Sequence, residues 1–299
     1  LDNMGAIGWY DQDFDKVGRA IMERCGADSV CSGKMREIAG GDPWQAVEHI
    51  FSLVDQEGLC PAFAPLDRES LRNLLGGLSA DWSRRMLVPA TLYRLDRCNT
   101  DDQEAIYQLF DGPEGSHQSE NLKSTAVRTN IIISELLGPG IDFDTARAFS
   151  EQSYFSTDLT LYGTYAREYG GWPPYPLDDC ADRFPDTDLP ILILNGDLDP
   201  NTHVDLARFA SEAYDKADQR LVVLPGVPHA AIFESRMQTD YHDMINTCAM
   251  DLALQFFEDP EKSLDLSCLD QLIQPDFSGV TERALEAAHA AFGRDSVWD

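Results

Sequence analysis

Hydrophobic positions recur at helical spacing through the first half of the chain. Between Asp11 and about Gly171, apolar side chains return at steps of three and four residues, the period of a helix with one buried face. The clearest series are Phe14, Val17, Ile21 and Met22; Ala46, Val47, Ile50, Phe51 and Val54; Leu71, Leu74 and Leu75; and Ile106, Leu109 and Phe110. The stretch from Asn130 to Leu137 fits either a strand or a buried helical turn.

The pattern changes near Leu189, after a stiff connector. Gly170 to Pro176 contains consecutive prolines, which exclude a helix. Beyond it, Ile191 to Leu194 and Leu221 to Leu224 are continuous apolar runs, typical of strands buried on both faces of a parallel sheet. The segment between them predicts the crossover helix that parallel pairing requires, with Val204, Ala207, Ala210 and Tyr214 on one face. Two further helices are predicted, over Thr247 to Phe257 and Thr281 to Phe292.

An acidic residue follows the first apolar run, and a histidine follows the second. Asp199 lies three residues after Gly196, and His229 ends the segment Gly226-Val-Pro-His. The carboxyl ends of parallel strands meet at one edge of a sheet, where functional residues collect. A carboxylate there can accept the Nδ1 proton of an imidazole and orient it as a general base. We therefore predict that Asp199 and His229 are the acid and base of a Ser…Asp…His triad.

Two other interpretations compete for the same residues. Asp199 could be an Asx-type turn residue after a strand, although Asp197, next to the Gly turn, fits that role better. Asp197 to Asn201 also begins like a calcium loop, but that loop needs Gly at its sixth position and Glu at its twelfth, where this chain has Thr202 and Arg208. The remaining histidines show no ligand spacing. We expect no metal and no cofactor.

The nucleophile of such a triad should lie upstream on a Gly-x-Ser-x-Gly elbow, and the sequence contains none. Ser79, in Gly77-Leu-Ser-Ala-Asp81, lacks the final Gly and a preceding strand. Leu1 is not an initiator Met, and no basic-plus-apolar leader opens the chain. We expect the chain to begin inside a longer protein, with the serine on an N-terminal segment or on a companion chain.

Charge and cysteine content narrow the partners and the compartment. The formal net charge of −29 disfavours nucleic acid and anionic lipid as partners, and no run of about 18 apolar residues predicts a membrane span. Seven cysteines show no zinc spacing. Cys25 with Cys31, and Cys248 with Cys268, bracket segments short enough for a disulfide, although sequence alone does not determine connectivity. Disulfides would indicate an oxidising compartment, and the odd count leaves one thiol over.

Two segments together resemble a known family. Leu-Pro-Ile-Leu-Ile-Leu-Asn-Gly-Asp-Leu-Asp-Pro-Asn-Thr, from Leu189 to Thr202, and Leu224 to His229 are similar to the C-terminal part of α/β-hydrolase-fold exopeptidases. These are the secreted tripeptidyl aminopeptidase and proline iminopeptidase group of serine peptidases. Leu92 to Cys98 is a supporting match in the helical region, and Cys248 and Cys268 are weaker ones.

The resemblance implies a fold, a division into parts and a substrate. It implies an α/β class in which residues 1–9 end a core strand, 10–186 form a helical lid and 187–299 form the C-terminal part of the hydrolase core with a tail. It also implies that a lid carboxylate, for which Glu135 is the candidate, binds the free amino group of a peptide substrate. The expected activity is release of residues from peptide N-termini through an acyl-enzyme, in a secreted protein that is inert as this chain alone.

Two other functions remain open. An esterase could use the same triad, with an apolar lid pocket in place of carboxylates that contact an amine. A catalytically inactive interaction protein could reuse the fold, since fold does not determine function. Retention of both Asp199 and His229 argues against the inactive protein.

Overall fold

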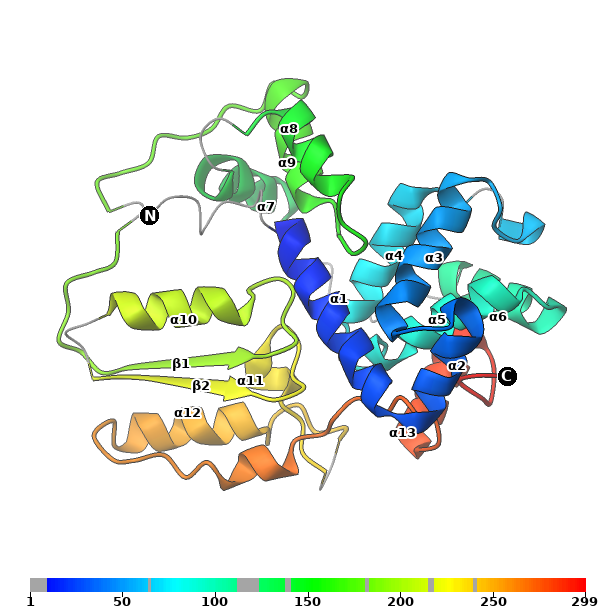
Figure 1. Cartoon of the computed structure of the whole chain (residues 1–299). Helices are drawn as coiled ribbons and strands as arrows, with labels where there is room; N and C mark the ends of the chain where they lie inside the picture. Colours follow the sequence, from blue (N-terminus) through cyan, green and yellow to red (C-terminus); the bar gives the residue numbers. More distant parts are fainter. Residues whose placement is uncertain are drawn as a thin grey trace. The chain divides into compact units, whose positions relative to one another are not determined.

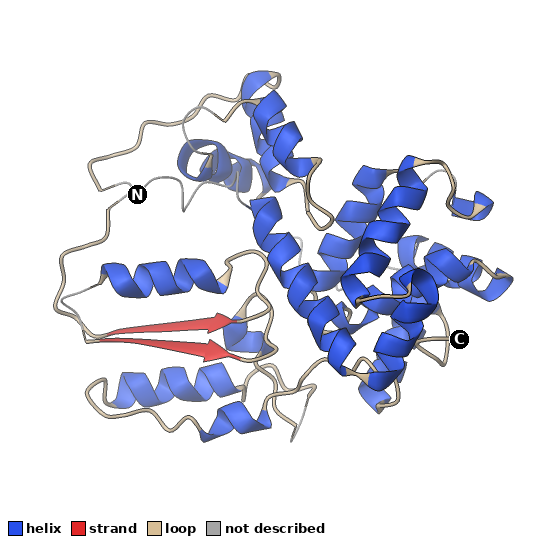
Figure 2. Cartoon of the chain, in the orientation of Figure 1, coloured by secondary structure: helices blue, strands red, loops and turns tan. Residues whose placement is uncertain are grey.

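The computed structural model describes residues 10–63, 66–111, 124–137, 141–180, 183–214, 218–238 and 241–299. These residues form two compact units. The helical unit comprises residues 10–176 and 276–299, and the sheet unit comprises residues 177–275. The protein is α-rich with a small parallel sheet, as the secondary structure in Figure 2 shows.

The helical unit consists of helices and short helical turns (Figure 1). Its α-helices are α1 (Tyr10–Ala27), α2 (Ser29–Ala39), α3 (Pro43–Asp55), α4 (Arg68–Ala80), α5 (Val88–Arg97), α6 (Thr100–Asp111), α7 (Thr125–Ile131), α8 (Phe143–Ser150), α9 (Leu159–Glu168) and α13 (Glu282–Phe292). Its shorter turns are η2 (Pro61–Phe63), η3 (Arg85–Leu87) and η5 (Ile132–Leu136), the last of which is π-helical. The ambiguous stretch from Asn130 to Leu137 is therefore helical.

Aspartates begin several of these helices, which gives part of the acidic excess a local role. Asp28, Asp42, Asp67 and Asp142 are the N-caps of α2, α3, α4 and α8, and each side chain accepts backbone N–H bonds of the first turn. A carboxylate at this position satisfies otherwise unpaired donors and interacts favourably with the helix dipole. The apolar faces predicted for α1 and α3 are buried, which confirms the helical periodicity.

The C-terminal tail packs on the helical unit. Helix α13 contacts α6, and the buried Arg94 of α5 donates from Nη2 to the backbone carbonyls of Ser296, Val297 and Asp299 at 2.9–3.1 Å. The sequence-based division assigned these residues to the C-terminal part and placed its boundary after residue 186. The structure places that boundary after residue 176 and returns 276–299 to the helices, because Arg94 holds the tail through contacts that are remote in sequence.

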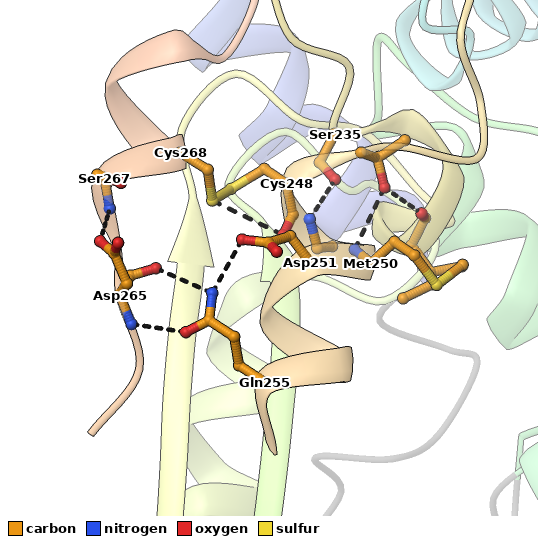
Figure 3. The surroundings of a disulfide bond; sticks show 11 residues. Ser235, Cys248, Met250, Asp251, Gln255, Asp265, Ser267 and Cys268 are labelled. Carbon is orange, nitrogen blue, oxygen red and sulfur yellow. Dashed lines mark hydrogen bonds between the residues drawn. A yellow bond between two sulfur atoms is a disulfide. The ribbon is translucent and has the colours of Figure 1, made fainter. Parts of the chain in front are cut away.

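Three disulfides cross-link the chain. Cys25–Cys31 and Cys60–Cys98 lie in the helical unit, and Cys248–Cys268 joins a helix of the sheet unit to a following turn (Figure 3). The first and third close the loops that the sequence indicated. The second closes a segment of 38 residues, a separation that gives no local sequence signal. Cys180 is exposed and unpaired. Three disulfides are typical of proteins from oxidising compartments.

Removing the Cys60–Cys98 bridge should destabilise the helical unit. We expect the double substitution Cys60→Ser with Cys98→Ser to lower the free energy of unfolding by about 2–4 kcal/mol, because the reduced chain regains loop entropy when unfolded. Urea denaturation followed by circular dichroism measures the loss. Cys180→Ser is the control and should leave the midpoint unchanged; an equal midpoint for both variants would show that the bridge contributes nothing.

The buried Asp11 and the partly buried Asp15 attach α1 to the segment between α8 and α9. Asp11 accepts a hydrogen bond from the Ser156 hydroxyl, and Asp15 accepts the backbone N–H groups of Tyr154 and Phe155 at 2.8 and 2.9 Å. Burial raises the pKa of both Asp11 and Asp15 to about 6, against the opposing effect of these hydrogen bonds. The folded protein therefore holds protons that the unfolded chain loses near pH 4.

This difference makes stability depend on pH in a definite direction. Since the pKa values are raised on folding, their stabilising contribution is present below about pH 4 and is lost as the pH rises to about 6. We expect Asp11→Asn to reduce the fall in unfolding free energy between pH 4 and pH 7 by about 2–3 kcal/mol, because the amide does not ionise. Unfolding free energies measured across that range test this expectation. The exposed Asp144→Asn should keep the full slope. An unchanged slope in Asp11→Asn would contradict the assignment.

The sheet unit contains two parallel strands with helices on either side (Figure 1). Its elements are β1 (Ile191–Gly196), α10 (Val204–Ala213), β2 (Gln219–Leu224), α11 (Ala231–Glu234), α12 (Cys248–Glu258) and η6 (Ser267–Gln271). The register pairs Ile191 with Gln219 and Gly196 with Leu224. The predicted strands, crossover helix and parallel pairing are confirmed.

The strands are less buried than the sequence indicated. Continuous apolar runs predicted burial on both faces, but Ile191 to Leu194 are only half-buried. Among the described residues the sheet has two strands, so each is an edge strand with one unpaired side. The core lies mainly on the side of α12, where Leu224, Cys248 and Leu252 are fully buried. Gln255 on α12 hydrogen-bonds the backbone of Asp265 beside the disulfide (Figure 3).

Candidate catalytic pair

The structure brings Asp199 and His229 together at the carboxyl edge of the sheet. Asp199 lies in the turn after β1, and His229 lies in the turn after β2. Nδ1 of His229 is 3.0 Å from Oδ2 of Asp199 and 3.2 Å from Oδ1. A carboxylate only accepts hydrogen bonds, so Nδ1 carries the proton and neutral His229 presents the lone pair of Nε2. This is the tautomer required of a general base.

Asp199 is buried and its oxygens are well satisfied. Its exposed fraction is 3 %, and its Oδ1 accepts the backbone N–H groups of Asn201 and Thr202 at 2.9 and 2.8 Å. The Thr202 hydroxyl donates to Oδ2 at 2.7 Å. These bonds hold the carboxylate in one orientation toward His229. The sequence assigned no role in the pair to Thr202, because nothing in its spacing marks the contact.

The bonds to Asn201 and Thr202 also make Asp199 an Asx-turn residue, the role that the sequence favoured for Asp197. Asp197 instead accepts the N–H of Gly226 at 2.6 Å through Oδ1, and so joins the turn after β1 to the turn after β2. The difference arises because the two turns are remote in sequence and adjacent in space. Asp199 therefore fulfils the local turn role and the contact with His229 together.

The two turns approach too closely for larger residues at two positions. A Cβ atom on Gly196 would lie 2.0 Å from the carbonyl oxygen of Val227, which accepts the Leu198 N–H at 3.0 Å. Gly226 has a φ of +75°, a left-handed conformation that glycine adopts without strain. Backbone contacts thus set the separation of Asp199 and His229.

His229 is accessible, unlike its partner. Its side chain is 47 % exposed, and Nε2 has no hydrogen-bond partner among the described residues. The hydrogen bond that His229 Nδ1 donates to Asp199 raises the pKa of His229 above its usual value, partial burial acts in the opposite direction, and the charge of Asp199 adds to the increase. The arrangement can remove a proton from a group that approaches Nε2.

The pKa of His229 can be measured directly on this chain. We expect an NMR titration to place it above about 6.5, and Asp199→Asn to lower it, because the amide removes the negative charge. The stabilising contribution of this pair is present below the unfolded pKa and is lost as the pH rises through the folded value. His289, an exposed histidine near Asp295, serves as the reference ring. A His229 titration that is unchanged in Asp199→Asn would exclude the contact in solution.

The other candidate residues lie in the helical unit. Glu135 is exposed on the π-helical turn η5, on a different unit from Asp199 and His229. Ser79 is fully buried within α4, and its hydroxyl donates to the carbonyl of Gly76 at 2.8 Å. A hydroxyl that is buried in this way is not accessible to a substrate, which agrees with the low ranking of Ser79 as a nucleophile.

Among the described residues, no group of three or more His, Cys, Asp or Glu side chains is arranged to hold a metal ion. No described helix is long and apolar enough to cross a membrane. Comparison of the chain with protein-family models, with curated proteins and with solved structures finds no match.

Proposed function

We propose that this chain supplies the acid and the base of a serine hydrolase of the α/β-hydrolase fold, with the nucleophilic serine outside the chain. The observation that carries the proposal is the bond from His229 Nδ1 to the buried Asp199, which leaves Nε2 without a partner among the described residues. In this proposal Asp199 is the acid and His229 is the base. Both follow adjacent parallel strands, and acyl transfer to a serine uses a base that is oriented by a carboxylate in this way.

The proposed chemistry assigns one task to each group. His229 Nε2 takes the proton of the serine hydroxyl as its oxygen attacks the acyl carbon, and the Asp199 carboxylate stabilises the resulting imidazolium. The imidazolium then gives that proton to the departing amine, which leaves an acyl-enzyme. In the second half, His229 takes a proton from water, whose oxygen attacks the ester, and the proton returns to the serine.

The sheet unit supports the presence of further strands in the assembled enzyme. Both strands have one unpaired edge among the described residues, and β1 is half-buried despite its apolar sequence. Leu189, Ile245 and Phe257 are at least 70 % exposed. A two-stranded sheet with this much exposed apolar surface gains stability when more strands cover it. The unit carries the features expected of part of a larger sheet.

The substrate proposal rests on the family resemblance. Within a secreted exopeptidase, Glu135 would bind the free amino group of a peptide, and its exposure leaves the carboxylate accessible. An ammonium–carboxylate pair of this kind orients the peptide with its N-terminal end toward the lid. An esterase would need no such group.

Labelling with a serine-directed phosphonate tests the proposal. The chain is expressed together with the segment that precedes it in its gene, and the complex is treated with an aminoalkyl phosphonate. We expect one serine of that segment to be labelled in the wild type and not in His229→Ala, because phosphonylation needs the base. Hydrolysis of aminoacyl amides rather than esters then separates the peptidase from the esterase. A precursor without a labelled serine would refute the hydrolase and favour the inactive interaction protein.

A further inference from the structure

The helical unit contains a cavity of about 1070 Å³, open to solvent and formed by α4, α7, α8 and α9 with the start of η5. Its size matches pockets that hold organic ligands rather than single ions. Apolar and aromatic side chains make up much of its wall, among them Ile132, Phe143, Leu159, Leu161, Tyr162 and Tyr165. Tyr162 and Tyr165 are about half-exposed, at 49 % and 54 %, so this aromatic surface is available to a ligand.

Four arginines line the cavity, and two of them have no acidic partner among the described residues. Arg68 is bound to Asp55 at 3.0 Å, and the buried Arg72 is bound to Asp158 at 2.6 Å. Arg128 and Arg147 form no ion pair and no side-chain hydrogen bond with described residues, although the chain carries more than twice as many acidic as basic side chains.

Arg147 is positioned by an aromatic platform. Its guanidinium lies 4.5 Å from the centre of the Phe143 ring, and that ring packs edge-on against Tyr165 and Tyr169 at 5.7 and 5.4 Å. Stacking through its face leaves the N–H groups at the edge of a guanidinium available for a bidentate bond. The fixed orientation reduces the entropy lost when a carboxylate binds.

A second, more apolar groove of about 580 Å³ continues from the cavity and shares Arg128, Ile132 and Leu159 with it. Val127, Ile131 and Leu136 add apolar side chains to its wall, and Ser124 adds a polar one. Arg128 therefore stands where a charged wall meets an apolar groove. Glu69 and Glu151 also line the cavity, so its walls disfavour ligands with several negative charges.

We propose that this cavity binds an organic monocarboxylate, with the carboxylate on Arg128 and Arg147 and an aliphatic or aromatic body in the adjoining groove. A free acid and an apolar peptide with a free C-terminal carboxylate present this same chemistry. The site goes beyond the proposed hydrolase and does not depend on the Asp199–His229 pair.

Calorimetric titration of the full chain with defined probes tests the site. Octanoate is compared with octanol, and acetyl-phenylalanyl-leucine with its C-terminal amide. We expect at least one carboxylate to bind about tenfold more tightly than its neutral counterpart. Arg128→Gln and Arg147→Gln should each weaken that binding about tenfold, and Arg147→Lys should weaken it less. Arg183→Gln, at an exposed arginine of the sheet unit, is the matched control.

Each result decides the proposal. Binding of octanoate alone identifies a free acid, and binding of the peptide alone identifies a peptide carboxylate; both support the site. Absence of binding by both carboxylates overturns it. So does equal binding of the neutral counterparts, or binding that Arg128→Gln and Arg147→Gln leave unchanged. None of these measurements uses hydrolase activity, so the cavity and the proposed function can fail separately.

Discussion

In the proposed hydrolase, assembled with its serine-bearing segment, Asp199→Asn is expected to lower kcat/KM about 10⁴-fold, with little change in fold. The amide of an asparagine can donate to Nδ1, which favours the tautomer with the proton on Nε2, where it cannot act as a base. The Asx-turn bonds from Asn201 and Thr202 can still be accepted by the amide oxygen. His229→Ala should cause a loss of similar size. The measurement is hydrolysis of an aminoacyl amide by the complex described above.

A second His–carboxylate pair provides the matched control. His289 lies 3.3 Å from Asp295, and both side chains are largely exposed. His289→Ala should leave kcat/KM unchanged, since this pair lies on the surface of α13 and its following turn. The effects of removing two members of one catalytic unit are not additive. The kcat/KM of the double variant Asp199→Asn with His229→Ala should therefore lie within about tenfold of that of either single variant. Activity reduced less than tenfold in Asp199→Asn would contradict its role as the triad acid.

Asp102→Ala is expected to cause the largest loss of stability, about 3–5 kcal/mol in the free energy of unfolding. Asp102 and Arg94 are both fully buried, with Arg94 Nη1 3.0 Å from Oδ1 of Asp102. Arg97 adds two further bonds to the same carboxylate at 2.7 and 2.8 Å. Removal of the carboxylate leaves a buried guanidinium without its counter-charge. Urea denaturation measures the loss, and the tail residues held by Arg94 should become accessible to proteolysis.

The neighbouring Asp101 is the matched control on the same helix. Its side chain is 72 % exposed and its ion pair with Arg294 is 3.4 Å long, so Asp101→Ala should change stability by less than about 1 kcal/mol. Replacing both buried partners, as in Arg94→Met with Asp102→Leu, should recover part of the loss, because no buried charge remains. Equal stability of the Asp101 and Asp102 variants would contradict this account.

Local patterns predicted the helical character of the first part of the chain and the strand–helix–strand segment of the sheet unit, but left Asn130 to Leu137 open between strand and helix. The three- and four-residue periodicity located the buried faces of α1 and α3, and two apolar runs located β1 and β2 to within a few residues. Their parallel pairing followed because the helix between them is long enough for a crossover. Such patterns arise from neighbouring residues, so a single sequence contains them in full.

Contacts between distant segments could not be predicted in this way. The Cys60–Cys98 bridge, the attachment of the tail by Arg94 and the contact from Asp197 to Gly226 join residues between 29 and 205 positions apart. The partial exposure of β1 was also missed, because apolar sequence alone does not reveal how many neighbours a strand has. The cavity of the helical unit needs four helices to be in place before it exists.

For the candidate site, the sequence by itself determined which residue types end the two strands and that Asp199 and His229 follow them in the order of a triad. The tertiary structure decided that their side chains meet, that Asp199 is buried and that His229 is accessible. The physical reason is that a hydrogen bond between two turns depends on backbone contacts across them. Here those contacts include the close approach of Gly196 to Val227 and the bond from Gly226 to Asp197, and neither leaves a periodic trace in the sequence.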